Sequence, residues 1–168
     1  FTVYKNFTNF DTTICSKDAI QLKSSIPNPD SPYTIIWSPA AGLSNDKVPS
    51  PIAKPLHDQQ YVATISQKIG GNTCIALDTT NITVLQWFQL FNKDTAMCKG
   101  DPVQVRMRAD LRYKYKWQPY RGLDDTASVA PLIHADTDIT YVVTATYPGC
   151  KDSSASFSIS IIPIPDTF

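Results

Sequence analysis

An internal repeat limits the fold of this chain more than any other feature of its sequence. The segment from Asp11 through Cys15 matches the segment from Asp94 through Cys98, and each copy ends with a second cysteine, Cys74 or Cys150. Such self-similarity identifies the folding unit, here one of roughly eighty residues. The repeat therefore predicts two tandem modules, residues 1–86 and 87–168.

Aromatic residues extend the match through the middle of each copy. Trp37 is followed by Tyr61, and Trp117 by Tyr141, and the members of each pair are 24 positions apart. Because this spacing is the same without an insertion, the two modules are expected to share one fold.

The composition indicates which fold class this is. All 15 acidic residues are aspartate, and the chain has 13 prolines and 8 tyrosines. Glutamate supports exposed helices, whereas Thr, Val, Ile and Tyr suit strands. The sequence therefore predicts an all-β protein.

Alternation along the chain predicts strands with one buried face. Tyr113, Tyr115 and Trp117 fall on one side of a strand, and Lys114 and Lys116 on the other. Several such short strands separated by turns indicate a β-sandwich.

The central residues Trp37 and Trp117 favour an immunoglobulin-like topology in each module. So does the Asp-x-x-Tyr pattern at Tyr61 and Tyr141, which resembles a tyrosine corner whose hydroxyl bonds back to the chain.

Turn and linker residues predict the connections. The Pro-rich stretches 26–32 and 48–55 are interpreted as loops, because proline cannot donate to a ladder. Gly70-Gly71 is expected to form a hairpin turn, and residues 82–86 a short linker. Trp87 and Phe88 are expected to lie in a first strand, with a packed contact as the alternative.

Matched cysteines predict one disulfide inside each module, Cys15–Cys74 and Cys98–Cys150. Disulfides in turn imply an oxidising, extracytoplasmic setting. The alternative is four reduced cysteines in a cytosolic protein. A metal site is disfavoured, since each module offers two separated cysteines and no matching histidine.

The sequence shows no catalytic or cofactor-binding constellation. His57 and His134 do not occupy matching positions, and the adjacent carboxylates Asp124 and Asp125 fit a turn better than acid–base catalysis. Calcium at Asp46, or at Asp124 and Asp125, is an alternative without a ligand run to support it. We therefore expect no enzyme activity, no cofactor and no metal.

Charge and hydropathy argue against two further classes of protein, those that bind nucleic acid and those that insert into membranes. The net charge is zero, which argues against binding to nucleic acid. The apolar runs are far shorter than the ~20 residues needed to span a bilayer, so membrane insertion is not expected.

A cluster of basic residues distinguishes the second module from the first. Alternation places most of its members on one face of a predicted hairpin, where they could hold an acidic polysaccharide or an acidic patch of a partner. The alternative is a solvated face that discourages edge pairing. The cluster comprises Arg106, Arg108, Arg112, Lys114, Lys116 and Arg121.

An ordered set of residues across the second module resembles the PKD-like, immunoglobulin-fold repeats of very large surface proteins in Bacteroidota. The first module matches more loosely, and the Trp-Asp-Phe-Gly-Asp-Gly signature of true PKD domains is absent. The matching residues are Cys98, Gly100, Asp101, Val103, Tyr115, Trp117, Pro119, Gly122, Leu123, Pro131, Thr140, Tyr141, Val142, Val143, Thr144, Gly149 and Cys150.

Residues 162–168 are similar to the lead-in to the type B C-terminal sorting domain of type IX secretion cargo. This resemblance implies non-catalytic stalk repeats of a cell-surface adhesin of the gliding-motility type, monomeric and in contact with neighbouring repeats. One alternative is a binding module for polysaccharide or for secretion or motility components. Another is a linker in a secreted hydrolase.

Overall fold

The computed structural model describes residues 2–8, 11–26, 30–91 and 94–163, and these form strands, turns and loops without a helix. The chain divides into two compact units, Phe1–Leu85 and Gln86–Phe168. We call them module 1 and module 2 and describe each by itself.

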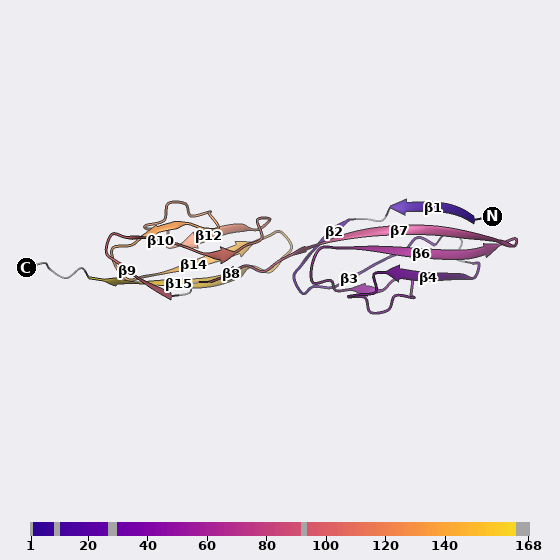
Figure 1. Cartoon of the computed structure of the whole chain (residues 1–168), viewed down its shortest axis with the longest axis horizontal. Helices are drawn as coiled ribbons and strands as arrows, with labels where there is room; N and C mark the ends of the chain where they lie inside the picture. Colours follow the sequence, from indigo (N-terminus) through magenta and orange to yellow (C-terminus); the bar gives the residue numbers. More distant parts are fainter. Residues whose placement is uncertain (1, 9–10, 27–29, 92–93, 164–168) are drawn as a thin grey trace, which may run out of the picture. The chain divides into compact units, whose positions relative to one another are not determined.

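Module 1 is built on one large sheet in which the last strand, β7, pairs with the first two strands, β1 and β2 (Figure 1). Strands β1 and β2 both run parallel to β7, while β6 pairs with β7 and β4 with β6 in antiparallel fashion. A short second sheet pairs β3 with β5. The bounds are β1 Thr2–Thr8, β2 Thr12–Cys15, β3 Ile20–Gln21, β4 Tyr33–Ser38, β5 Ile52–Ala53, β6 Gln59–Ile69 and β7 Asn72–Leu85.

Module 2 repeats this plan. Its large sheet has the order β12-β14-β15-β9, and β9 again runs parallel to the last strand, β15. Two short sheets pair β10 with β13 and β8 with β11. The bounds are β8 Gln89–Leu90, β9 Asp94–Cys98, β10 Pro102–Gln104, β11 Met107–Arg108, β12 Lys114–Gln118, β13 Leu132–His134, β14 Ile139–Thr146 and β15 Ser153–Ile162.

The predicted strand faces are confirmed in β12. Tyr115 and Trp117 are buried while Lys114 and Lys116 are exposed, and Tyr113, which precedes the strand, is buried as well. Burial of these large apolar surfaces stabilises the module by about 25 cal/mol per Å² removed from water.

A tryptophan occupies the core of each module in the same way. Trp37 and Trp117 are each 1% exposed. Their indole N–H groups donate to the main-chain carbonyls of Val48 at 3.0 Å and Ser128 at 2.9 Å. Each indole is therefore buried with its polar group satisfied, as a tightly packed core requires.

The tyrosine corners are also present in both modules. The Tyr61 hydroxyl donates to the carbonyl of Ala41 at 2.8 Å, and the Tyr141 hydroxyl donates to that of Arg121 at 2.5 Å. Burial raises the pKa of both phenols above the ordinary value, so both hydroxyls keep their protons at neutral pH.

The predicted disulfides Cys15–Cys74 and Cys98–Cys150 are wrong. Cys15 and Cys150 are disulfide-bonded, whereas Cys74 and Cys98 are free thiols. Cys15 lies opposite Leu85 at one end of β7, and Cys74 lies near the other end of that strand. At ~3.3 Å per residue these positions are about 35 Å apart, while a disulfide needs Cα atoms within about 7 Å.

The same geometry applies in module 2. Cys98 lies opposite Ile162 at the end of β15, and Cys150 comes before that strand begins at Ser153. A pair inside the module would have to bridge the length of β15, so matched sequence positions do not indicate the pairing.

Three smaller expectations also change. Residues 48–55 contain β5, because the carbonyl of Pro51 accepts the N–H of Leu22 at 2.9 Å and proline lacks only the donor. Residues 82–85 belong to β7 and are not a linker. Trp87 and Phe88 precede β8 and are not in a strand, and the Phe88 ring meets Tyr115 edge-on. The Gly70-Gly71 hairpin turn is confirmed between β6 and β7.

Candidate functional site

The basic residues of module 2 do not share the face of one hairpin. Arg108 lies in β11, which pairs with β8, whereas Lys114 and Lys116 lie in β12, which pairs with β14. The turn after Asp110 therefore carries the chain from one sheet to another. The alternation correctly indicated the exposed side of each strand, but it carried no information about which sheet each strand joins. Arg106 and Arg121 are exposed in loops outside the strands.

Arg112 is engaged by Asp110. Its Nε and Nη2 atoms donate to the two carboxylate oxygens at 2.8 Å and 2.5 Å, and the main-chain N–H of Gln86 donates to Oδ2 at 2.9 Å. The hydrogen bond from Arg112 lowers the pKa of Asp110 from its ordinary value to about 2. Since this carboxylate neutralises Arg112, that residue is poorly placed to hold an anionic ligand.

Lys114 and Lys116 lie among hydroxyl side chains on the exposed face of the large sheet. Lys114 is opposite Thr146, Lys116 is opposite Thr144, and Thr144 is opposite Ser154 on the next strand. The strands β12, β14 and β15 contain no acidic residue. We call this surface the lysine–hydroxyl face. It offers two ammonium groups and a row of hydrogen-bonding groups on one face of the sheet.

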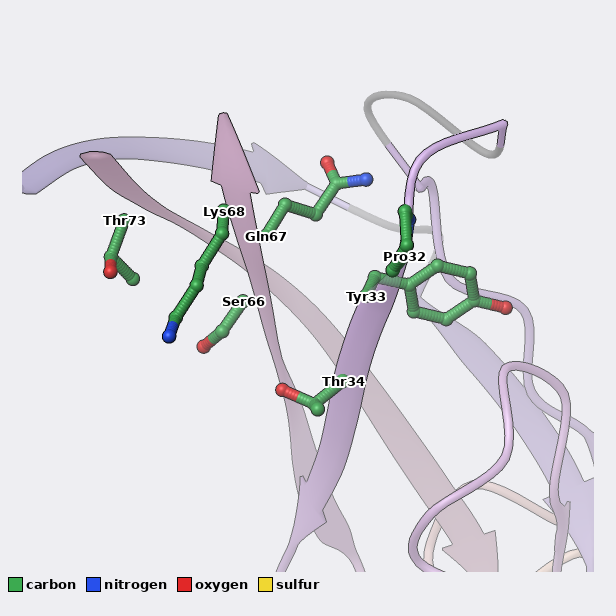
Figure 2. Close-up of a pocket in the computed structure, with 7 residues that line it drawn as sticks. All are labelled: Pro32, Tyr33, Thr34, Ser66, Gln67, Lys68 and Thr73. Carbon is green, nitrogen blue, oxygen red and sulfur yellow. The ribbon is translucent and has the colours of Figure 1, made fainter. Parts of the chain in front are cut away.

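Module 1 has a pocket that the sequence did not indicate (Figure 2). Its volume is about 270 Å³, just below the ~300–1,000 Å³ of typical ligand sites. Figure 2 shows Lys68, Ser66 and Thr34 pointing to one side, while Gln67 points toward the segment that holds Pro32. The lining residues are Pro32, Tyr33, Thr34, Ser66, Gln67, Lys68 and Thr73.

The chemistry of this pocket is limited to hydrogen bonding and one positive charge. Gln67 is 3% exposed and its amide donates to the carbonyl of Ser31 at 3.5 Å. Among the residues that the structure describes, the lining contains no carboxylate, histidine or cysteine that could act as an acid, base or nucleophile. The pocket was missed because its residues alternate between the two faces of β6, and a strand pattern does not show where a sheet ends.

The carboxylates weighed for calcium or catalysis instead organise turns. Asp124 Oδ1 accepts the N–H groups of Asp125 at 2.7 Å and Leu132 at 2.8 Å. Asp125 Oδ1 accepts the N–H of Ala127 at 2.8 Å. Across residues 2–8, 11–26, 30–91 and 94–163, no three His, Cys, Asp or Glu side chains are grouped so as to hold a metal ion, so Asp46 is in no such group. His57 and His134 are both exposed.

Two remaining sequence features are limited by the described residues. Of the segment that resembles a sorting-domain lead-in, residues 164–168 lie outside the part of the chain that the structure describes. In the parts that are described, no helix has the length and apolar character needed to cross a bilayer.

Comparison with known proteins identifies the fold. No protein-family model and no curated protein matches the sequence. The solved structure of DIP-gamma IG1+IG2 has a TM-score of 0.54 and 12% identity, and the match covers 92% of this chain and 93% of that one. The complex of Dpr2 Ig1-Ig2 with DIP-Theta Ig1-Ig3 gives a TM-score of 0.52 at 15% identity, covering 92% of this chain and 62% of that chain.

A third structure contains the N-terminal eight Ig domains of Down Syndrome Cell Adhesion Molecule, with a TM-score of 0.52 and 13% identity. That match covers 88% of this chain and 23% of the other. At such low identity these likenesses concern the fold alone. The chain therefore consists of tandem immunoglobulin-like domains of the all-β class.

Proposed function

We propose that the two modules form a non-catalytic, force-bearing spacer in an extracellular adhesion protein. One observation carries this proposal: the last strand of each module is paired in parallel with the strand that opens the module's large sheet. In module 2, Asp94 of β9 lies opposite Ser158, and Cys98 lies opposite Ile162 at the other end of the ladder.

Parallel pairing determines how a stretching force acts on the module. Once the disulfide of Cys15 and Cys150 is reduced, force applied at the two ends of the chain pulls β9 from its Asp94 end and β15 from its Ile162 end. These ends point in opposite directions along the strand axis. All ladder hydrogen bonds are then loaded together in shear, so they must break together instead of one after another. In module 1 the ladders of β1 and β2 on β7 have the same geometry.

The setting of this spacer follows from its cysteines and its resemblance. Disulfide-bonded Cys15 and Cys150 indicate an oxidising compartment. Tandem immunoglobulin-like domains occur in a protein named as a cell adhesion molecule. The resemblance to Bacteroidota repeats supports a cell surface reached by type IX secretion, in an adhesin of the gliding-motility type.

Single-molecule force spectroscopy tests the proposal. The full chain, with the disulfide of Cys15 and Cys150 reduced, is stretched between its termini, and the expected trace shows two separate, abrupt unfolding events. Forced unfolding is governed by the unfolding barrier, which the sheared ladders raise. Gradual extension at low force without discrete events would contradict a spacer that bears force.

The lysine–hydroxyl face supports a second candidate function, binding of an acidic polysaccharide. Lys114 and Lys116 project from β12, and β12, β14 and β15 contain no carboxylate, whereas β9 at the other edge of the sheet contains Asp94. Binding to alginate is expected to weaken as salt rises, because exposed charges are screened over ~8–10 Å at ordinary ionic strength.

Paired variants separate this face from the other basic residues. Lys114→Asp with Lys116→Asp is expected to abolish alginate binding, while Arg106→Asp with Arg108→Asp changes the net charge equally but lies outside β12. An equal loss of alginate binding in both double variants would show that net charge alone attracts the polymer. Binding that persists in the lysine pair would exclude this face.

A further inference from the structure

The last strands of the two modules differ in what pairs with their outer side. In module 1, β1 runs parallel to β7 and pairs with Thr73–Thr79, and β2 pairs with Ile82–Leu85 (Figure 1). In module 2, β9 pairs with Ser158–Ile162 of β15, as β2 does with β7. The segment before β9 instead forms β8, which pairs with β11 in another sheet. Within the residues that the structure describes, no strand of module 2 takes the place of β1.

The stretch of β15 that corresponds to the β1-paired part of β7 is Ser153–Phe157. The tyrosine corners fix this correspondence, because Tyr61 lies opposite Thr80 and Tyr141 lies opposite Phe157. On one side the stretch pairs with β14. On the other side no strand of the described part of the chain pairs with it, since β9 begins opposite Ser158. We call this second side of Ser153–Phe157 the open edge.

The main-chain groups that point to the open edge can be identified from one hydrogen bond. The N–H of Ile161 donates to Asp138, which immediately precedes β14, so Ile161 faces β14. Main-chain directions alternate along a strand. Ser154 and Ser156 therefore direct their N–H and C=O groups away from β14, toward the open edge.

The open edge lacks the side chains that usually keep strand edges from pairing. Charged residues and proline protect many exposed edges, and Ser153–Phe157 contains neither. By contrast, β12 at the far side of the same sheet exposes Lys114 and Lys116. Ala155 is half-buried, whereas Asp78, its counterpart in module 1, is fully buried. An added strand would thus find room beside Ala155 and remove further apolar surface from water.

We propose that the open edge binds an extended segment of a partner polypeptide, which adds parallel to β15 as β1 adds to β7. Addition of a strand to a sheet edge gains main-chain hydrogen bonds and is a recurring mode of peptide recognition. The pattern for the partner segment is β1 itself, Thr2–Thr8, which has the sequence TVYKNFT. It contains no acidic residue and no proline, and Val, Tyr, Phe and Thr favour the extended conformation.

A second copy of this chain is a poorer occupant than such a segment. Its β1 would have to leave the seven residues of β7 with which it pairs, so the exchange would gain no ladder. A partner segment that is not already in a sheet gives up no such pairing. Binding at the open edge is independent of the force-bearing role, so its test can fail while the force measurement succeeds.

The test uses the full chain, labelled with nitrogen-15, and a synthetic peptide with the sequence of Thr2–Thr8. Amide hydrogen exchange measured by NMR is expected to slow at Ser154 and Ser156 when the peptide is in excess. The amide of Ala155 faces β14 and should change little. Unchanged exchange at both serines, equal slowing at all three residues, or slowing confined to β7 of module 1 would overturn the proposal.

Two variants at one position make the test selective. Ser156→Pro removes an N–H from the open edge and leaves the β14 ladder intact, because that N–H points away from β14. It is expected to weaken peptide binding about tenfold. Ser156→Ala keeps the N–H and should bind like the unmodified chain. Slow exchange at Ala155 verifies that β15 is folded in each variant, and equal peptide affinities of the two folded variants would overturn the proposal.

A dilution series of the chain without peptide separates the two possible occupants. The exchange rates of Ser154 and Ser156 are expected not to depend on the concentration of the chain. Exchange at both serines that slows as the concentration rises would identify a second copy as the occupant and would overturn the assignment to a partner segment.

Discussion

The carboxylate of Asp138 accepts a hydrogen bond from the main-chain N–H of Ile161 at 2.7 Å. In module 1, Asp58 makes the equivalent bond to Val84, also at 2.7 Å. Both acceptors open the Asp-x-x-Tyr pattern, and both donors lie in the part of the last strand that is paired with the edge strand. The Asp-x-x-Tyr pattern thus makes a second hydrogen bond, from the last strand to the aspartate, besides the one that the tyrosine hydroxyl donates.

Loss of this bond should weaken module 2. We expect Asp138→Ala to lower the free energy of unfolding of module 2 by about 1 kcal/mol, because a charged acceptor is lost at a largely exposed site. Hydrogen-exchange mass spectrometry can measure this in β15 while the peptides of module 1 serve as an internal reference. Asp136→Ala, at an exposed aspartate two residues earlier, is the matched control and should change little.

Gly122 is expected to tolerate a side chain poorly. Its φ is 77°, and a Cβ there would lie 2.2 Å from the carbonyl oxygen of His134. Gly149 has a similar φ of 85° but no atom within 4 Å of such a Cβ. Gly149→Ala should cost about 1–2 kcal/mol through its left-handed backbone alone.

The Gly122→Ala variant should cost more than that, because the clash also disturbs the hydrogen bond from the His134 N–H to the Gly122 carbonyl, 2.7 Å long. Denaturant unfolding of both variants measures the difference. Equal losses of stability would show that the loop moves aside freely and that the close packing against β13 is unimportant.

The stability of module 2 should depend on pH through Asp110. Its pKa is about 2 in the folded state because Arg112 and main-chain N–H groups donate to the carboxylate, against an ordinary value of 3.8. A carboxylate whose pKa is lower in the folded state stabilises the fold at pH values above its pKa in the unfolded chain. This contribution disappears as the pH falls from about 4 toward 2.

We expect Asp110→Asn to reduce the free energy of unfolding by about 1–2 kcal/mol at pH 7 and by much less at pH 2. The side chain of Asp110 is 8% exposed and that of Arg112 is 39% exposed, so solvent screens part of the interaction. Urea unfolding at both pH values measures the effect, with Asp152→Asn as an exposed control. A loss that does not change with pH would show that the carboxylate charge is not the cause.

Local patterns predicted the parts of the fold that depend on neighbouring residues. Alternation gave the buried face of β12, and the Asp-x-x-Tyr pattern gave the corners at Tyr61 and Tyr141, because both signals lie within a few residues of one another. The disulfides required the register of β2 on β7, where Cys15 meets Leu85. That register is set by pairing across most of a module, and the sequence alone carries no sign of it.

The prediction that the basic residues of module 2 share one hairpin face was wrong for a related reason. Arg108 and Lys114 are close in sequence and both are exposed, yet their strands join different sheets. In a sandwich, consecutive strands often change layer, and the strand pattern is the same whether they do or not. The pocket beside Gln67 could not be predicted from the sequence either, because it forms where the ends of three strands lie together.

The force-bearing role is tested most directly by two adjacent proline variants in β9. The N–H of Lys99 donates to the carbonyl of Ile162 in β15 at 3.4 Å. Since donors alternate along a strand, the N–H of Thr95 also faces β15, whereas the N–H of Ala96 faces away from it. Thr95→Pro therefore removes a sheared hydrogen bond, and Ala96→Pro places the same residue in the same edge strand without removing one.

Single-molecule stretching of both variants from the chain termini, with the disulfide of Cys15 and Cys150 reduced, measures the unfolding force of module 2. We expect a clearly lower force for Thr95→Pro and a force close to that of the unmodified chain for Ala96→Pro, with module 1 unchanged in both. Equal forces in the two variants and the unmodified chain would show that the β9–β15 ladder does not resist extension, and would contradict the spacer role.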